Sequence, residues 1–286
     1  MPELPEVETT CRQIKAKVLE RAFLDVWTDF PKMIKRPKSF DEFKKKIKNK
    51  KIEKIWRAGK NIIFDLSDNF SLLIHQKLTG HLLHGTWNME HETWVPASNP
   101  FLEEKVNTYI HLMFFLDDGE MLALSDLRKF AKIELWSQTE LKKELSSLGP
   151  DPLEIDFNEF KKRLIKKRGK IKQVLIDQEI ISGVGNIYSD EVLFEAKVHP
   201  LKEIKQLSNK ENKRVYQALR KILRKAIELQ GESISDYRTP SGERGGFDKL
   251  RKVYRREGEP CLRCGTIIKR VKIGGRSAHF CPQCQQ

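Results

Sequence analysis

Near the start of the chain, apolar positions recur at the spacing of a helix. They lie three or four residues apart and would share one face: Leu4, Val7, Cys11, Ile14 and Val18. A proline is tolerated in the first turn, and the acidic residues there suit the positive end of the helix dipole. The pattern predicts a helix over residues 3–19, in which Cys11 is a core residue.

From about residue 22 to residue 136 the pattern becomes that of short strands. Five runs are rich in apolar residues: Phe23–Trp27, Asn61–Leu66, Phe70–His75, Tyr109–Leu116 and Glu120–Leu124. Asp117-Asp118-Gly119 predicts a hairpin between the last two runs. Many short strands after one helix favour a β-sandwich or barrel. The stretch 86–106 shows no periodicity, which predicts a long surface loop.

Helical spacing returns after Gly149-Pro150-Asp151-Pro152, a sequence typical of a linker. Four segments are predicted to be helices: Phe157–Lys167, Ile171–Asp177, Ile187–Ala196 and Ser208–Leu229. Residues 231–249 are rich in Gly, Ser, Asp and Arg, which predicts a mobile loop. We therefore expect an α+β chain with a strand-rich first part and a helical second part.

Length and charge narrow the possible functions. The chain has 286 residues, enough for two domains with cores of their own. Lys and Arg number 54 against 40 Asp and Glu, a formal net charge of +14. This excess favours a polyanionic partner, most often nucleic acid, over a basic surface kept only for solubility. No apolar run approaches the roughly 20 residues of a membrane span, and the acidic N-terminus does not resemble a signal peptide. We expect a cytoplasmic protein.

The cysteines near the C-terminus form two knuckles, Cys261-x-x-Cys264 and Cys281-x-x-Cys284, with 16 residues between them. Two such knuckles joined by a hairpin supply the tetrahedral thiolate set that zinc prefers. Four thiolates leave no position for water, so the spacing predicts one structural Zn²⁺. The hairpin between the knuckles is basic. Gly274-Gly275 could form a tight turn that projects Arg276 towards phosphate, although a solvated charged face is the simpler alternative.

The second residue offers a possible nucleophile. A small residue after Met1 favours removal of Met1, which would free the secondary amine of Pro2. An α-amino group has a pKa of about 7.7–8.0, and a helix N-terminus lowers it further. A secondary amine that attacks a sugar carbon forms an iminium ion, which acts as an electron sink. Without further context, Pro2 could equally be a proline that begins a helix.

The context is the opening string Met1-Pro2-Glu3-Leu4-Pro5-Glu6-Val7-Glu8-Thr9, which resembles the N-terminal signature of the formamidopyrimidine-DNA glycosylase family. Further landmarks follow in the order that this family shows: Arg57-Ala58-Gly59-Lys60, Asp126-Leu127-Arg128-Lys129-Phe130, Gly183-Val184-Gly185-Asn186-Ile187-Tyr188, Val253–Cys261 and Gly275-Arg276-Ser277. The resemblance covers essentially the whole chain. The combination is specific, although each piece alone is not.

The resemblance implies an α+β fold with an N-terminal β-sandwich that includes the N-terminal helix, a helix–two-turns–helix domain and a C-terminal zinc ribbon. DNA would lie in the cleft between the domains. The implied division is a catalytic domain over 1–136, a linker over 137–155 and a helix–two-turns–helix domain over 156–232. A lesion-capping loop over 233–250 and a zinc-ribbon finger over 251–286 would follow.

The resemblance also implies residue roles. Pro2 would be the nucleophile, Glu3 the acid and base, and Glu6 its support on the same helix face. Lys60 would contact the lesion and its phosphate, and Asn186 and Arg276 would bind phosphates beside the flipped nucleotide. The void-filling residues would be Leu78, Arg128 and Phe130. On the residues alone, Lys60 could be a turn lysine, Phe130 a core aromatic, and the Asn186 turn a simple helix connection. Gln76-Lys77-Leu78 departs from the Leu-Gly-Met that the family more often has here.

The implied function is a bifunctional DNA glycosylase and abasic-site lyase of base excision repair. It would act on damaged double-stranded DNA, excising 8-oxoguanine and formamidopyrimidines, as a monomer associated with a bacterial nucleoid. Two alternatives stay open: an endonuclease VIII-like enzyme for oxidised pyrimidines, and a non-catalytic zinc-ribbon DNA-binding protein. The Leu4-Pro5-Glu6 string and the glycine-rich loop over 236–247 favour the purine enzyme.

Overall fold

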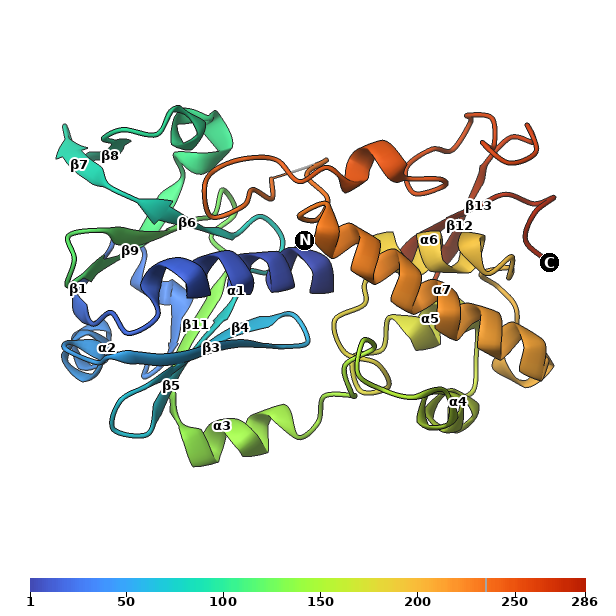
Figure 1. Ribbon diagram of the computed structural model, residues 1–286, viewed down its shortest axis with the longest axis horizontal. Coiled ribbons are helices and arrows are strands. Elements are labelled where there is room, and N and C mark those ends of the chain that lie inside the picture. The colour runs from blue at the N-terminus through green and yellow to red at the C-terminus, as the bar shows by residue number, and fades with distance from the viewer. Residues whose placement is uncertain (235) are drawn as a thin grey trace. The chain divides into compact units, whose positions relative to one another are not determined.

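The computed structural model describes residues 1–234 and 236–286 (Figure 1). The chain divides into two compact units, each made of two segments. The first unit holds Met1–Ser146 and Leu229–Gly246, and the second holds Ser147–Glu228 and Phe247–Gln286. Residue 235, which belongs to the predicted lesion-capping loop, lies outside the described residues.

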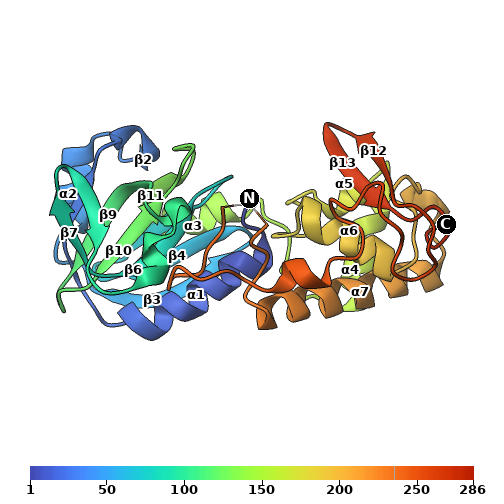
Figure 2. The same ribbon diagram turned by 90° about the horizontal axis from the view of Figure 1, so that it is seen from above.

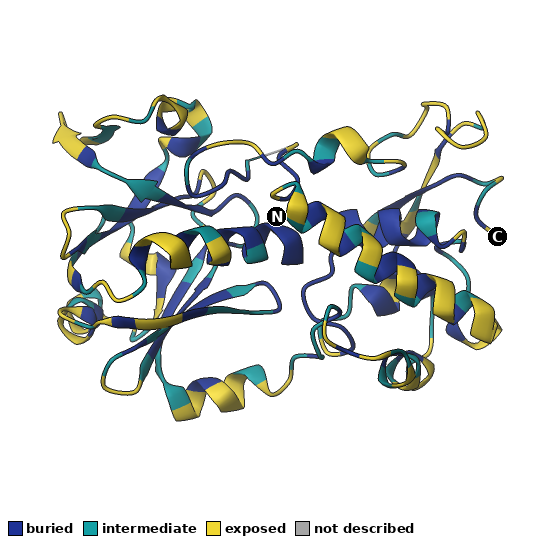
Figure 3. Ribbon diagram, in the orientation of Figure 1, coloured by how far each residue is buried: buried dark blue, intermediate teal, exposed yellow. Residues whose placement is uncertain are grey.

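The first unit begins with helix α1, Leu4–Val18. Glu3 is its N-cap residue and forms a capping box with Glu6, so the first turn is fixed by reciprocal hydrogen bonds. The predicted apolar face is buried and packs against the strands β3 and β4. In Figure 3 the first turn is buried, whereas the other end of the helix is largely exposed. Cys11 lies in the core as expected, and burial raises the pKa of its thiol.

Two sheets form the body of this unit. The first has the order β1 (Phe23–Thr28), β9 (Ile110–Leu116), β10 (Met121–Ser125) and β6 (His81–Gly85), and all its pairs are antiparallel. The second has the order β2 (Ile34–Arg36), β11 (Lys132–Ser137), β5 (Phe70–His75), β4 (Asn61–Leu66) and β3 (Ile52–Ala58), with one parallel pair, β2 with β11. Side chains from both sheets share one apolar core, in which the rings of Phe23 and Phe114 lie 5.0 Å apart. The sheet-rich first part of the predicted α+β fold is confirmed.

Three stretches of this unit differ from the sequence prediction. Helix α2 (Phe40–Ile47) lies where only strands were expected; Ser39 caps it, and Phe43 is buried. The stretch 86–106 is not an irregular loop, because it contains the hairpin β7 (Trp87–Glu90) and β8 (Thr93–Pro96) and the 3₁₀ turns η2 (Pro100–Glu103) and η3 (Lys105–Asn107). The predicted linker contains helix α3 (Gln138–Leu145), which has a capping box of its own.

The second unit contains four helices in its described part, all near their predicted positions: α4 (Phe157–Ile165), α5 (Ile171–Leu175), α6 (Asn186–Glu195) and α7 (Asn209–Glu228). Helix α6 packs against α7 and against β13 (Arg276–Phe280), which pairs with β12 (Lys269–Ile273). Figure 2 shows this hairpin standing beside α5 and α6. Two further 3₁₀ turns are η4 (Ile204–Gln206) and η5 (Phe247–Leu250). No helix of the described residues is long and apolar enough to cross a membrane.

A buried polar network joins the hairpin to the helices of the second unit. Asp190 of α6 pairs with Lys172 of α5 at 2.6 Å, and both side chains are fully buried. The other carboxylate oxygen of Asp190 lies 2.9 Å from His279 Nδ1 and accepts a hydrogen bond from the His279 backbone N–H. A buried charge pair with further hydrogen bonds fixes geometry more than it adds stability. The network therefore sets the position of β13 on the helices.

Candidate active site and metal centre

The start of α1 brings Pro2 and Glu3 together in a buried position. Pro2 is buried, and the residues Glu3 and Glu6 are 2% and 1% exposed. The Glu3 backbone N–H donates to Glu6 Oε2 at 2.7 Å, which orients the first turn. While Met1 is present, the Pro2 nitrogen belongs to a peptide bond, so Pro2 can act as an amine only after Met1 is removed.

The second oxygen of Glu6 holds a segment from the far end of the sequence. Glu6 Oε1 accepts a hydrogen bond from the Glu232 backbone N–H at 2.8 Å. The Tyr237 hydroxyl donates to the Glu6 backbone carbonyl at 3.2 Å. Burial and the Glu6 carboxylate raise the pKa of the Tyr237 phenol. Glu6 therefore links the helix start to the loop that follows α7.

Sequence reasoning missed Glu232 and Tyr237 as partners of Glu6. Glu232 contributes its backbone N–H, which every residue except proline carries, so no side-chain signal marks it. The one sequence hint is Gly231, whose φ is +84°. A Cβ atom at Gly231 would lie 2.7 Å from Glu6 Oε1, so only glycine fits here without displacement.

Lys60 lies in the turn between β3 and β4, beside Gly59, whose φ is +59°. It is 9% exposed. The neighbouring Arg57 binds Glu8 Oε2 at 2.9 Å and so joins β3 to α1. Burial, together with the charges of Lys77 and Lys60, lowers the pKa of His75 to about 3. The imidazole of His75 is therefore neutral at physiological pH, and the positive charge in this region comes from lysine.

The segment around Arg128 is shaped by a buried carboxylate. Asp126 accepts hydrogen bonds from the backbone N–H of Ala131 at 2.7 Å and from the Thr79 hydroxyl. These bonds fix the conformation of the turn, in which Phe130 is 50% exposed. Phe130 is therefore not a core aromatic. The Arg128 guanidinium lies 4.6 Å from the centre of the Phe130 ring, a cation–π contact.

Two further side chains contribute apolar surface near this turn. Leu78 is half-buried, one residue before Thr79, which binds Asp126. Leu127 is 49% exposed, and sequence reasoning did not single it out. The sequence signal available for Leu127 was a hydrophobic residue placed between an aspartate and an arginine. The turn presents apolar side chains and one guanidinium to solvent, which is the composition of a wedge that inserts between bases.

In the second unit, Asn186 is the first residue of α6. It follows Gly183, with φ at +87°, and Gly185, the N-cap residue, which provides no side-chain cap. The Gly183 N–H donates to Gln178 Oε1 at 2.8 Å, which fixes the turn. The N-terminus of a helix favours anions because the dipole and the N–H groups point outward. The turn is thus suited to bind a phosphate.

Arg276 is exposed at the tip of the β12–β13 hairpin. The two preceding glycines have φ values of +53° and +76°, as the predicted tight turn requires. A Cβ atom on Gly274 would lie 2.5 Å from Gln173 Nε2, so the hairpin tip approaches α5 closely. The structure places Arg276 and Asn186 in the same unit, and Pro2, Glu3, Glu6, Lys60, Leu78, Arg128 and Phe130 in the other.

The four cysteine Sγ atoms lie within 4.8 Å of one another. Three of the Sγ–Sγ distances are 4.0 Å (Cys261 to Cys284), 3.4 Å (Cys264 to Cys281) and 3.3 Å (Cys264 to Cys284). A zinc ion with bonds of about 2.3 Å needs sulfurs about 3.8 Å apart, so this set fits a tetrahedral Zn²⁺. Backbone N–H groups also point at the sulfurs, from Arg263 to Cys261 and from Cys284 to Cys281.

Fold and metal centre together define an α+β protein whose N-terminal sheet unit carries a buried helix start and whose helical unit carries a zinc finger. Three family models match. Residues 1–133 match the formamidopyrimidine-DNA glycosylase N-terminal domain, 148–238 its H2TH domain, and 258–286 the zinc finger found in FPG and IleRS.

Whole-chain comparisons agree. The formamidopyrimidine-DNA glycosylase of Bacillus cereus is 36% identical, and the match covers 100% of this chain and 99% of that protein. The complex of Lactococcus lactis Fpg with DNA containing an abasic site has a TM-score of 0.86 at 34% identity and covers 99% of both chains. A structure of MutM with DNA containing carbocyclic 8-oxo-G has a TM-score of 0.86 at 34% identity and covers 100% of both. The chain belongs to the formamidopyrimidine-DNA glycosylase family.

Proposed function

We propose that this chain is a bifunctional DNA glycosylase and abasic-site lyase of base excision repair, which removes 8-oxoguanine and formamidopyrimidines from damaged double-stranded DNA. The observation that carries the proposal is the buried start of α1, where Pro2 precedes Glu3 and Glu6 binds the Glu3 backbone N–H. Family membership over the whole chain supports it, and so do the abasic-site and 8-oxo-G DNA bound in the similar structures.

The chemistry begins at the amine that removal of Met1 exposes. The lone pair of the Pro2 nitrogen forms a bond to C1′ of the damaged nucleotide, and the glycosidic bond breaks with its electron pair on the base. The departing base takes up the proton that the Pro2 nitrogen loses. Glu3 donates a proton to the ring oxygen, which opens the sugar and leaves an iminium ion between Pro2 and C1′. The buried position of Glu3 keeps competing water away from this proton transfer.

The iminium ion then drives strand cleavage. It acidifies the proton on C2′, whose removal expels the 3′ phosphate by β-elimination, and a second loss of a proton expels the 5′ phosphate by δ-elimination. Hydrolysis of the iminium frees Pro2. The product is a one-nucleotide gap with phosphates at both ends.

Recognition requires that the damaged nucleotide leave the duplex and that its place be filled. In this proposal Leu78, Arg128 and Phe130 fill the gap, and the exposure of Phe130 supports that role. Lys60 contacts the lesion and its phosphate. Asn186 at the helix N-terminus and Arg276 on its glycine turn bind the phosphates on either side of the flipped nucleotide.

The zinc site is structural in this scheme. The apolar cluster around the knuckles is small: Phe194, Val253, Cys261, Ile268 and Cys281, with Cys284 packed against it. A domain with so little core depends on its metal for folding. Zinc would therefore hold the hairpin that presents Arg276, and no chemical step uses it.

We further propose that the protein acts as a monomer at the bacterial nucleoid.

A substrate panel tests the proposed function. Purified protein is incubated with duplexes that carry 8-oxoguanine, a formamidopyrimidine or thymine glycol, and each reaction is trapped with borohydride. We expect the strongest excision and trapping on the two purine lesions. Preference for thymine glycol would instead indicate the endonuclease VIII-like activity. Absence of excision and of trapping on all three duplexes would indicate a DNA-binding protein without catalysis.

A further inference from the structure

The segment Leu229–Gly246 forms a closed loop within the first unit. The Gly246 N–H donates to the Leu229 carbonyl at 2.7 Å, so the two ends of the loop meet. Its first part is bound to the start of α1 through the Glu6 contacts with Glu232 and Tyr237. The loop therefore begins beside the residues that carry the proposed chemistry.

The second part of this loop is held by one carboxylate. Arg238 is 3% exposed and binds Glu104 with two parallel hydrogen bonds, both of 2.6 Å. Arg244 binds the same carboxylate at 2.7 Å. The two guanidinium groups lower the pKa of Glu104 to about 2, so it is ionised under all physiological conditions. Two-pronged arginine–carboxylate pairs are strong and geometrically specific.

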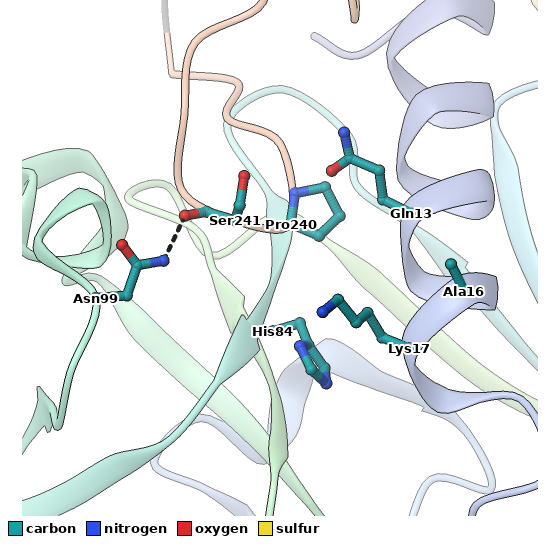
Figure 4. A pocket seen from close by; sticks show the side chains of 7 residues that line it. All are labelled: Gln13, Ala16, Lys17, His84, Asn99, Pro240 and Ser241. Atoms are coloured by element: carbon teal, nitrogen blue, oxygen red, sulfur yellow. Dashed lines mark hydrogen bonds between the residues drawn. The ribbon is translucent and has the colours of Figure 1, made fainter.

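Backbone groups of the loop are held by side chains from the same region as Glu104. The Asn107 amide donates to the Gly242 carbonyl at 3.2 Å, while its oxygen lies 2.8 Å from His81 Nε2. The Asn99 amide donates to the Ser241 carbonyl at 2.9 Å, as Figure 4 shows. Each of these contacts fixes the path of the chain.

Two further contacts complete the attachment of the loop. The backbone N–H of His84, in β6, donates to the Pro240 carbonyl at 2.8 Å. Gly242 has a φ of +89°, and a Cβ atom there would lie 2.8 Å from the Phe101 carbonyl oxygen, so the loop packs closely on η2. The mobile loop predicted over 231–249 is thus fixed at both ends in the described residues. A cavity of about 350 Å³ lies between Pro240, His84 and α1 (Figure 4).

We propose that Glu104 is a positioning residue for base recognition, because it holds residues 237–244 in one conformation before DNA binds. The proposal rests on the proposed function. A loop that is already ordered loses less conformational entropy when it closes on a lesion, which strengthens binding of the extruded base. An abasic site offers no base to the loop, so its cleavage gains nothing from this order.

The test compares Glu104→Gln with Glu103→Gln. Glu103 is exposed and adjacent, so the control makes the same change in charge without touching Arg238. Two rates are measured for each variant: single-turnover excision of 8-oxoguanine and cleavage of a ready-made abasic site. Hydrogen exchange of peptides covering 237–244 reports the order of the loop directly.

We expect Glu104→Gln to lower the excision rate about tenfold, to change abasic-site cleavage less than about twofold, and to speed exchange in the loop. Glu104→Asp, which keeps the charge, should recover part of the excision rate. Arg238→Gln should lower excision by no more than Glu104→Gln, because Arg244 still binds Glu104 in that variant. The double variant should lose no more than Glu104→Gln alone, because that single change already removes the Arg238 pair.

Three results would overturn the proposal: excision by Glu104→Gln that matches Glu103→Gln, equal losses on both substrates, or unchanged exchange in the loop. A wild-type protein that fails to excise 8-oxoguanine would instead count against the proposed function. Hydrogen exchange would still decide whether Glu104 orders the loop in that case, so the two failures are distinguishable.

Discussion

Replacement of Gly231 by alanine tests whether Glu6 connects the loop over Leu229–Gly246 to the start of α1, where we propose that the chemistry occurs. Gly231 has a φ of +84°, and a methyl group there would lie 2.7 Å from Glu6 Oε1 and 2.8 Å from Glu6 Cγ. Ordinary contacts begin at 3.4 Å. Glu6 cannot move away without cost, because its two oxygens accept hydrogen bonds from the backbone N–H groups of Glu3 and Glu232.

The expected free-energy cost of Gly231→Ala has a general contribution from the backbone and further contributions from the contact with Glu6. Alanine in the left-handed region costs about 1–2 kcal/mol wherever it occurs. Crowding of a packed site adds about 1–3 kcal/mol, and displacement of Glu6 weakens a charged hydrogen bond worth about 1.5–3 kcal/mol. If half of the free energy of that hydrogen bond is lost where Glu3 acts, about 0.75–1.5 kcal/mol, base excision should fall about three- to tenfold, because each 1.4 kcal/mol is a factor of ten in rate.

Gly119→Ala supplies the matched control. Gly119 has a φ of +85°, in the hairpin between β9 and β10 of the same unit, and no atom lies within 4 Å of the added methyl group. Both variants are compared with wild type by urea unfolding and by single-turnover excision of 8-oxoguanine. We expect both to lose stability and only Gly231→Ala to lose excision activity. Equal excision rates in the two variants would refute the inferred link through Glu6.

Three further predictions follow from the site. Glu3→Gln should lower the rate of base excision far more than the rate of cleavage at a ready-made abasic site, since an abasic aldehyde needs no acid to open the sugar. Both rates are measured on gels, and equal losses on the two substrates would mean that Glu3 serves a common step. Cys281→Ser should lose zinc and DNA affinity together, and active protein without zinc by metal analysis would contradict the structural role. Because the pKa of Glu104 is lowered to about 2, its stabilising effect is complete above about pH 4.5 and is lost as the pH falls towards 2. With its side chain 34% exposed, the stability difference between wild type and Glu104→Gln should be about 1 kcal/mol at pH 6 in urea unfolding; a difference that stayed constant down to pH 2.5 would contradict the pairing.

Sequence patterns predict best the elements whose signal is local. Strands β4 and β5 match the predicted ranges Asn61–Leu66 and Phe70–His75, because polar turn residues separate two apolar runs. Helix α2 was not predicted because three consecutive lysines separate its two buried positions, Phe43 and Ile47, and leave little apolar periodicity. The hairpin of β7 and β8 was not predicted because its packing depends on distant parts of the chain: the ring centroids of Trp27 and Trp94 lie 5.3 Å apart.

The candidate site likewise contains residues that local sequence patterns identify and contacts that they do not. The zinc ligands follow from their spacing alone, and the roles we propose for Pro2, Glu3, Asn186 and Arg276 come from motifs. Two features could not be predicted from local pattern. The pairing of Glu104 with Arg238 spans 134 residues, and the bond from Glu232 to Glu6 uses a backbone N–H. Such contacts depend on the tertiary path of the chain, which no local pattern encodes.

The central claim, that Pro2 is the nucleophile, is tested most directly by locating the trapped adduct. The protein is first shown by mass spectrometry to have lost Met1, then reacted with 8-oxoguanine duplex in the presence of borohydride and digested. The account predicts that the DNA-linked peptide is N-terminal and that fragmentation places the sugar on the Pro2 nitrogen. An adduct on Lys60 or on any other lysine would contradict it.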